Sequence, residues 1–376
     1  MTPSLSPSDC SVPGPATSVP PENPARAQDF VHGAYYPSWK IYRKKAPSCM
    51  NLDIISHVYY AFVRLRADAV QHLDEKADTQ LPVDGTHGCL HALTQLRRDQ
   101  HPHLKLLVSV GGGSGSQPFP LVAADPQKRH RFAHSLRAFI DRFSLDGADI
   151  DWEHPSTPAH GAAYASLLAA ARAALPAPRY LLTTALPAGQ WCLRHVPLAA
   201  VAPLLSHLHL MAYDYAGPWT ARAGHCAQLH APRAPPDAFA ARSGDAAVRY
   251  LVERGVPPGK IVLGVPVYGR AFAGVARAGE EVRGPGGGEG GVYDYCELPL
   301  RGAREWVDEE VVAAGCVGGE EDGSWVSYET PWTVGRKAEY VREMGLAGLF
   351  YWTGVADKDG EGSLMESGWR ALRGEV

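Results

Sequence analysis

The stretch LDGADIDWE, residues 145–153, decides the fold of this 376-residue chain. Its first seven residues form one of eight short runs rich in apolar and β-forming residues. Several of these runs are almost continuously apolar, as expected for parallel strands covered on both faces. The eight runs are FVHGAYY (30–36), HVYYAF (57–62), LKLLVSV (104–110), LDGADID (145–151), YLLTTAL (180–186), HLHLMAY (207–213), KIVLGVPV (260–267) and LAGLFYW (346–352).

Segments with helical patterns lie between these runs. Asp125-Pro126 opens one, residues 159–175 are dominated by Ala and Leu, and residues 245–254 end at Gly255. Eight strands alternating with helices predict an α/β protein with a (β/α)8 (TIM) barrel. A doubly wound open sheet shows the same alternation and is the alternative, but the number of strands favours the barrel.

The spacing of the runs also indicates an insertion in the barrel. The seventh run ends at 267 and the eighth at 352, a step of 85 residues that is too long for one crossover. We therefore predict a small α+β insertion domain at 272–335, with the catalytic barrel at 29–271 and 336–376. The Pro- and Ser-rich residues 1–28 are predicted to be a disordered tail.

Composition excludes several classes of protein. Thirty-six basic against forty acidic residues leave a net charge of −4, which argues against nucleic-acid binding. No apolar run approaches the roughly 20 residues that cross a bilayer, so no membrane partner is expected. The seven cysteines lack the spacing of a zinc ribbon or a compact disulfide framework. We expect a monomer.

The N-terminal residues lack the basic region and the apolar core of a secretory signal peptide. The chain as written is therefore expected to be cytoplasmic or released by an unconventional route. It would be secreted if the true start of the protein lies elsewhere.

The acidic strand carries the clearest chemical signal. Asp149, Asp151 and Glu153 occupy every second position, so on a strand they point to the same side. Three like charges directed into a barrel are costly, so at least one carboxyl should keep a proton near neutral pH. Glu153 is outermost, at the strand end where barrel enzymes place catalytic groups. The intervening residues that should face the helices are Ala148, Ile150 and Trp152.

Two other interpretations of this segment remain open on the residues alone. A solvated acidic turn is one, although Ile and Trp would not normally interrupt such a turn. A divalent-metal site is the other, with His154 and Asp214 as further ligands.

Residues 146–153 resemble the DxxDxDxE signature of family 18 glycoside hydrolases, the chitinases and their relatives. The resemblance extends from about residue 31 to residue 360 and includes motifs in the family's order. Details such as AYDYAGPW and GVPVYGRAF look most like fungal chitinases of the bacterial-type subgroup. The further motifs are the SxGG of Ser109–Gly112, the MxYD of Met211–Asp214, the YGR of Tyr268–Arg270, and Trp352 at the position of the family's active-site floor tryptophan.

The resemblance implies hydrolysis of β-1,4-linked N-acetylglucosamine with retention, using the substrate's own acetamide as nucleophile. Glu153 would be the general acid and then the base, and Asp151 would orient and stabilise the acetamido group. Asp149 would support Asp151, and Tyr213 would hydrogen-bond the acetamide oxygen. Asp214 would contact the distorted sugar, and no metal or organic cofactor is required.

Other residues are expected to bind chitin or chito-oligosaccharides. Aromatic side chains suit the apolar faces of sugar rings, and Tyr35, Phe62, Trp219 and Trp352 lie at or just after predicted strand ends. Arg270 is either a structural ion-pair partner or a sugar ligand. The remaining predicted substrate contacts are Gly112, Met211 and His154.

Two positions depart from the family pattern. Gly113 stands where many relatives have Trp, which predicts a weaker subsite on the glycone side. His154 stands where Tyr is usual, either as a packing substitute or as a titratable neighbour of Glu153.

Two alternative functions share the acidic motif. One is a non-catalytic chitin-binding lectin, which is less consistent with a chain that keeps Glu153, Asp151, Asp149 and Tyr213. The other is an endo-β-N-acetylglucosaminidase acting on N-glycans, although the insertion and the later motifs favour chitin.

Overall fold

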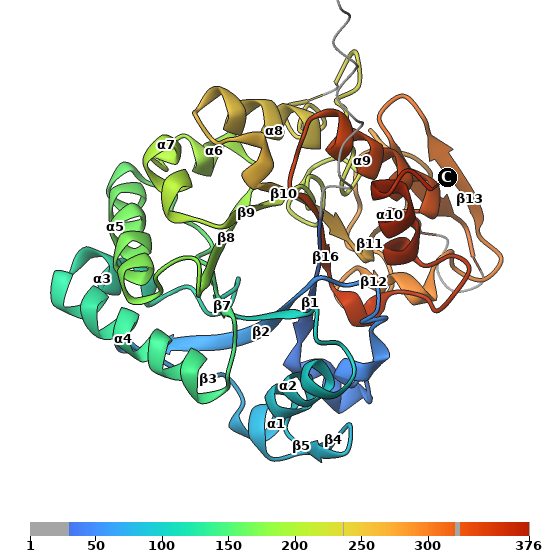
Figure 1. Ribbon diagram of the computed structural model, residues 1–376. Helices are drawn as coiled ribbons and strands as arrows, with labels where there is room; N and C mark the ends of the chain where they lie inside the picture. Colours follow the sequence, from blue (N-terminus) through green and yellow to red (C-terminus); the bar gives the residue numbers. More distant parts are fainter. Residues whose placement is uncertain (1–29, 236, 320–323, 376) are drawn as a thin grey trace, which may run out of the picture.

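The computed structural model describes residues 30–235, 237–319 and 324–375, so the predicted tail at 1–28 lies outside the described residues. Eight parallel strands close into a ring, which confirms the predicted barrel (Figure 1). Each predicted run overlaps one of these strands. They are β1 (Val31–Pro37), β2 (His57–Arg66), β6 (Lys105–Gly111), β7 (Gly147–Asp151), β8 (Leu181–Pro187), β9 (His207–Met211), β10 (Ile261–Pro266) and β16 (Gly348–Trp352).

The first and last strands close the barrel. β1 pairs with β2 on one side and with β16 on the other, with Val31 opposite Gly348. The short strand β3 (Ala69–His72) extends the sheet antiparallel to β2. A separate small hairpin consists of β4 (Pro82–Val83) and β5 (Thr86–His87).

Helices surround the ring of strands on its outer side (Figure 1). The helix α4 shows why they form where they do. Asp125 caps it by accepting hydrogen bonds from the backbone N–H groups of Gln127 and Lys128, and Pro126 occupies the first helical position. The helices are α1 (Glu75–Thr79), α2 (Cys89–Asp99), α3 (Phe119–Ala124), α4 (Pro126–Arg142), α5 (Pro158–Ala174), α6 (Gln190–Leu193), α7 (Leu198–Val201), α8 (Gly244–Glu253), α9 (Pro331–Glu343) and α10 (Leu364–Leu372).

A second, antiparallel sheet lies beside the barrel, between its seventh and eighth strands in sequence. Its strand order is β12-β11-β15-β14-β13. Trp325 is fully buried in this sheet and stacks on Phe272 and Trp306. The strands are β11 (Tyr268–Phe272), β12 (Val292–Asp294), β13 (Arg304–Asp308), β14 (Ala313–Val317) and β15 (Trp325–Tyr328).

The second sheet begins earlier than the predicted insertion at 272–335. Only Val267 separates the end of β10 from Tyr268, which already pairs with Asp294 of β12. Arg270 therefore belongs to the second sheet and not to the seventh barrel strand. At the other end, α9 begins at Pro331, so the last residues of the predicted insertion form a barrel helix.

The acidic strand β7 divides its side chains as predicted. Trp152, which directly follows it, stacks on Phe119 of α3 and meets Tyr164 of α5 edge-on, so this side faces the helices. Asp149 and Asp151 consequently point into the barrel.

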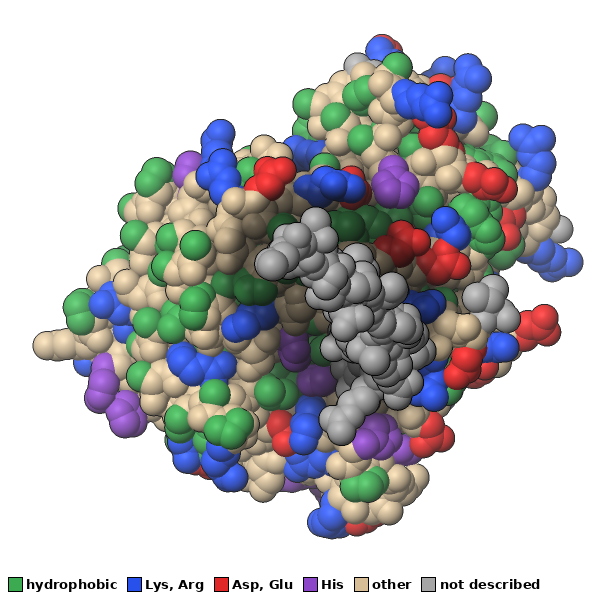
Figure 2. All heavy atoms as spheres, turned by 45° about the horizontal axis from the view of Figure 1, so that its top comes forward, with side chains coloured by type: hydrophobic (Ala, Val, Ile, Leu, Met, Phe, Trp, Pro, Cys, Tyr) green, Lys and Arg blue, Asp and Glu red, His purple; other side chains and the backbone are tan. Residues whose placement is uncertain are grey.

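Among the described helices, none is long and apolar enough to cross a membrane. Acidic and basic side chains are intermixed over the face shown in Figure 2.

Candidate active site

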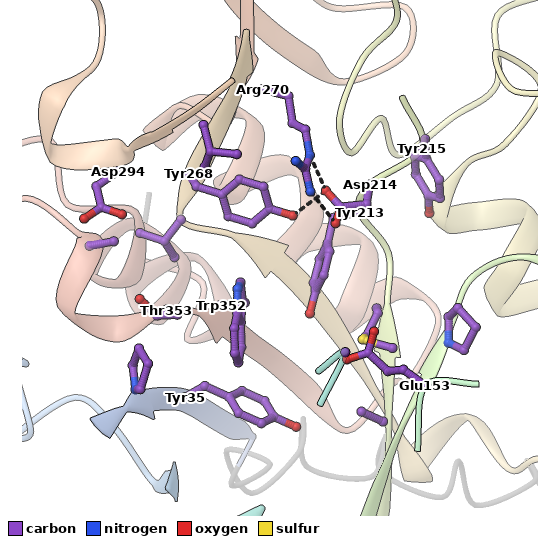
Figure 3. Close-up of a pocket in the computed structure, with 18 of the residues that line it drawn as sticks. Tyr35, Glu153, Tyr213, Asp214, Tyr215, Tyr268, Arg270, Asp294, Trp352 and Thr353 are labelled. Atoms are coloured by element: carbon purple, nitrogen blue, oxygen red, sulfur yellow. Dashed lines mark hydrogen bonds and ion pairs between the residues drawn. The ribbon is translucent and has the colours of Figure 1, made fainter. Parts of the chain in front are cut away.

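A cleft of about 1250 Å³ lies at the carboxyl ends of the barrel strands and extends to the second sheet. Figure 3 shows side chains from both parts of the fold converging on it. The predicted site residues that line it are Tyr35, Phe62, Asp151, Glu153, His154, Met211, Tyr213, Asp214, Trp219, Arg270 and Trp352.

The two remaining predicted residues lie behind the cleft wall. Asp149 is completely buried in the barrel. Gly112 packs against the ring of Phe62, where a Cβ would come within 2.5 Å of a ring carbon, and its φ is +77°. Gly112 is not among the residues that line the cleft, and its lack of a side chain allows close packing beneath it.

Three hydroxyl groups donate hydrogen bonds to Asp149. Oδ2 accepts hydrogen bonds from the hydroxyls of Tyr35 (2.8 Å) and Ser109 (2.7 Å), and Oδ1 accepts one from Thr183 (2.7 Å). Burial nevertheless raises the pKa of Asp149, although these three donors act in the opposite direction.

The carboxyl group of Asp151 is less well hydrogen-bonded than that of Asp149. Its Oδ1 is buried and has no hydrogen-bond partner among the described residues. Burial raises the pKa of Asp151 well above its usual value, and the charges of Glu153 and Asp149 add to the effect. An acidic group in this state can exchange a proton or turn toward a neighbouring group during a reaction.

Glu153 lies at the cleft surface with its backbone fixed from behind. Its N–H donates to the hydroxyl of Ser116 (2.9 Å), and that hydroxyl in turn donates to the carbonyl of Gly112 (2.9 Å). Burial, with a smaller contribution from the charge of Asp214, raises the pKa of Glu153 to about 7. Glu153 can therefore keep a proton near neutral pH, as the alternating carboxylates predicted.

His154 adjoins this acid but carries no charge at neutral pH. Its Nε2 is 3.6 Å from Oε2 of Glu153, and burial lowers the pKa of the imidazole to about 4. The side chain thus acts on Glu153 as a neutral polar neighbour.

Asp214 links the barrel to the second sheet. The guanidinium of Arg270 reaches both of its oxygens at 2.8 Å, and the hydroxyl of Tyr268 donates to Oδ1 at 2.6 Å (Figure 3). Arg270 also lies over the ring of Trp219, 4.8 Å from its centre. Of the two roles open for Arg270, the structure shows the ion pair. With Asp214 engaged in this way, no group of three or more His, Cys, Asp or Glu in the described ranges is placed to share a metal ion.

The floor of the cleft is aromatic. Trp352 stacks on Phe62 with ring centres 5.7 Å apart and meets Tyr35 at 5.4 Å. Tyr213 at the other side is packed edge-on against Tyr268. Flat apolar surfaces beside hydrogen-bonding groups are suited to a sugar chain, whose rings have apolar faces and polar edges.

Several cleft residues were not identified from the sequence. Trp39 and Trp191 are each 41% exposed and line the cleft, and Trp191 meets the ring of His154 edge-on at 5.1 Å. Both follow the end of a predicted strand within five residues, and that position was the signal available. Lys40 and Asp294 also line the cleft and form an ion pair across it at 2.5 Å.

A (β/α)8 barrel with a carboxyl of pKa about 7 beside buried carboxylates, in an aromatic cleft at the strand ends, has the features of a glycoside hydrolase active site. The chain belongs to glycoside hydrolase family 18. Residues 32–357 match the model of the family described as Glycosyl hydrolases family 18.

Similar sequences include fungal chitinases. Chitinase 1 of Aphanocladium album is 32% identical over 369 residues, which cover 92% of this chain and 86% of that protein. Endochitinase 1 of Metarhizium robertsii is 31% identical over 370 residues, with 93% and 86% covered.

Similar solved structures include a chitinase and an N-acetylglucosaminidase. Ostrinia furnacalis Group IV chitinase in complex with allosamidin has a TM-score of 0.83 at 26% identity, covering 93% of this chain and all of that one. A family 18 N-acetylglucosaminidase from Paenibacillus barengoltzii has a TM-score of 0.76 at 26% identity, with 92% and 100% covered. The present chain is thus a glycoside hydrolase of the chitinase type.

Proposed function

We propose that this enzyme hydrolyses the β-1,4 linkages of chitin and N-acetylglucosamine oligomers by a substrate-assisted, retaining mechanism. The observation that carries the proposal is the pairing of Glu153, whose pKa is about 7, with the buried and incompletely hydrogen-bonded Asp151. Glu153 can donate a proton, and Asp151, once its own proton has passed to Asp149, lies beside the reacting sugar as an anion.

In the first step, Glu153 protonates the leaving glycosidic oxygen. The carbonyl oxygen of the substrate's acetamido group attacks the anomeric carbon from within the same sugar, at high effective concentration. The intermediate is cationic, and a negative charge on Asp151 stabilises it in a site with little water. Glu153, now deprotonated, removes a proton from water in the second step, and the intermediate opens with retained configuration.

The surrounding residues position the sugar. The ring of Trp352 supports the sugar that is attacked, and the hydroxyl of Tyr213 hydrogen-bonds the acetamide oxygen. The fully buried Asp149 exchanges a proton with Asp151 as the charges change.

The alternatives have less support. A lectin would not need a protonated Glu153 next to Asp151, and the chain keeps the whole set of carboxylates. An N-glycan substrate is branched, whereas the cleft has ion pairs joining its walls at one end, Lys40–Asp294 and Arg43–Glu289.

The test is product analysis on the chitin tetramer, pentamer and hexamer, with Glu153→Gln as the inactive variant. We expect loss of general acid catalysis, worth about 10²–10⁴ in rate, with oligosaccharide binding retained. The same change at the exposed Glu361 is the matched control. Turnover by Glu153→Gln above a few per cent of wild type would contradict the assignment of the acid.

The stereochemistry is checked separately. Proton NMR of the first products should show the β-anomer before mutarotation. Initial appearance of the α-anomer would rule out the retaining mechanism.

A further inference from the structure

A histidine lies completely buried inside the barrel, in contact with the hydrogen-bond network of Asp149. His209 is on β9, and its Nδ1 is 2.9 Å from the hydroxyl of Tyr35 and 3.5 Å from Oδ1 of Asp149. Its Nε2 is buried without a hydrogen-bond partner in the described parts of the chain. The mechanism above does not use this side chain.

The imidazole is neutral. Its ring is enclosed by the rings of Tyr59, Phe350 and Tyr35, with centres 4.4, 5.1 and 6.0 Å away. Burial lowers the pKa of His209 well below its usual value, and the neighbouring imidazoles of His207 and His57 lower it further. A neutral imidazole has one N–H, so one ring nitrogen donates and the other accepts.

The Tyr35 hydroxyl has a single proton and two neighbours that can accept it. While Asp149 is an anion, Tyr35 must donate to Oδ2 of Asp149, at 2.8 Å. The oxygen of Tyr35 then needs a donor, and Nδ1 of His209 is the group at hydrogen-bond distance. This arrangement requires the tautomer with the proton on Nδ1.

Protonation of Asp149 reverses both hydrogen bonds. The carboxylic O–H of Asp149 donates to Tyr35, and Tyr35 donates to Nδ1 of His209, whose proton is then on Nε2. In total, Asp149, Tyr35 and His209 together gain one proton. Compared with the anionic state, Nε2 of His209 carries the additional proton, the former Nδ1 proton is on Tyr35, and the former Tyr35 proton is on Asp149.

We propose that His209 is a positioning residue that acts through Tyr35. With its proton on Nδ1, His209 holds Asp149 as an anion. With its proton on Nε2, it accommodates the protonated form of Asp149. The inference rests on the proposed function in so far as Asp149 serves hydrolysis. The groups that face Asp149 and His209 from the surrounding strands and the loops after them are Tyr35, His57, Tyr59, Ser109, Asp151, Glu153, Thr183, His207 and Tyr213.

The first experiment compares pH profiles of kcat/KM on a chromogenic chitobioside for His209→Leu and His209→Asn. Leucine can neither donate nor accept, so Asp149 is less well stabilised as an anion and the acidic limb should move up by about one pH unit. Asparagine can present either its N–H or its C=O to Tyr35, so its acidic limb should stay within about 0.3 units of wild type. If the acidic limbs of the pH profiles of His209→Leu and wild type coincide, the proposal is wrong.

The second experiment is a double-mutant cycle with Tyr35→Phe. Because His209 acts through the Tyr35 hydroxyl, His209→Leu should shift the acidic limb little in the Tyr35→Phe background. Equal shifts in both backgrounds would mean that His209 contributes only packing. Thermal melts of the four proteins identify any variant that has lost its fold.

The third experiment does not depend on activity. Histidine ¹⁵N NMR of the full chain, with His209 assigned from its absence in His209→Asn, should show the Nδ1–H tautomer at pH 7 and the Nε2–H tautomer below the acidic limb. The same tautomer at both values would refute the relay even if wild type hydrolyses chito-oligosaccharides. If wild type fails to hydrolyse them, the proposed function is wrong, while the NMR result still decides the role of His209.

Discussion

Arg270 of the second sheet and Asp214, in the loop after a barrel strand, are joined by two hydrogen bonds of 2.8 Å. Asp214 follows β9 of the barrel, and Arg270 is on β11 of the second sheet. The charge of Asp214 also helps to raise the pKa of Glu153. The ion pair therefore connects the placement of the second sheet with the protonation of Glu153.

Opposite pH shifts are predicted for the two partners. Asp214→Asn removes a negative charge near Glu153, so the pKa of Glu153 should fall and the alkaline limb of kcat/KM should move down by roughly half a unit to one unit. Arg270→Gln leaves the charge of Asp214 uncompensated, so the limb should move up. Initial rates from pH 5 to pH 10 measure both, and shifts in the same direction would contradict this electrostatic account.

The wild-type enzyme should lose activity as the pH rises through about 7. Glu153 must be protonated to act as the acid, and its raised pKa of about 7 places the loss there. Above that pH, kcat/KM should fall tenfold per unit. At low pH, activity should fall again as the Asp149–Asp151 pair takes up a second proton. A flat profile from pH 4 to pH 9 would be incompatible with these assignments.

Lys40→Ala should change which bond of an oligosaccharide is cut. Lys40 lies in the short 3₁₀ helix Ser38–Arg43 and pairs with Asp294 of β12, and Figure 3 shows Asp294 on the side of Trp352 away from Glu153. In the proposed mechanism that side holds the non-reducing sugars. Without the Lys40–Asp294 ion pair, the hexamer should be cut more often at bonds that have three or more sugars on their non-reducing side. Mass spectrometry in H₂¹⁸O gives the distribution, and Asp294→Asn should have the same effect.

Trp191→Ala should weaken the use of longer substrates. The indole is partly exposed in the cleft beside His154, where it can stack on a sugar ring. Loss of one such contact should reduce kcat/KM for the tetramer about three- to tenfold. Trp332 on α9 is similarly exposed, at 39%, but is not among the residues lining the cleft, so Trp332→Ala is the matched control. Equal losses in both variants would count against a substrate contact.

Lys337→Met should destabilise the fold. The ammonium group of Lys337 is 2.5 Å from Oε1 of Glu329 and from the carbonyl of Ala227, and both charged side chains are 2% exposed. Removing one partner of a buried pair leaves the other charge uncompensated, which costs about 3–5 kcal/mol. Denaturant unfolding measures the loss. Lys337→Met combined with Glu329→Gln should recover part of it, because the orphaned charge is gone.

The barrel could be predicted because several strands are buried on both faces and so appear as short, almost continuously apolar runs. The acidic strand was equally clear, since its period of two places Asp149 and Asp151 on the inner face. The start of the second sheet was not visible, because KIVLGVPVYGRAF has no turn signal between β10 and β11. Arg270 therefore falls within the predicted barrel segment 29–271, although it lies on β11 of the second sheet.

Motif matching also could not tell which side of the backbone faces the substrate. Gly112 lies in a matching motif, but its missing side chain serves the packing of Phe62. The role of His209 depends on two hydrogen-bond distances across the barrel, between residues far apart in sequence. Neither kind of information is contained in local pattern or spacing.

The pairing of β1 with β16 has a consequence for synthesis of the chain. Until Gly348–Trp352 leave the ribosome, β1 and β10 each have an edge without a partner. Tyr35 is carried on β1 and Trp352 on β16, so the active site cannot be complete before β16 has been translated. A nascent or truncated chain that lacks β16 exposes two apolar strand edges, which are sites for aggregation during that interval.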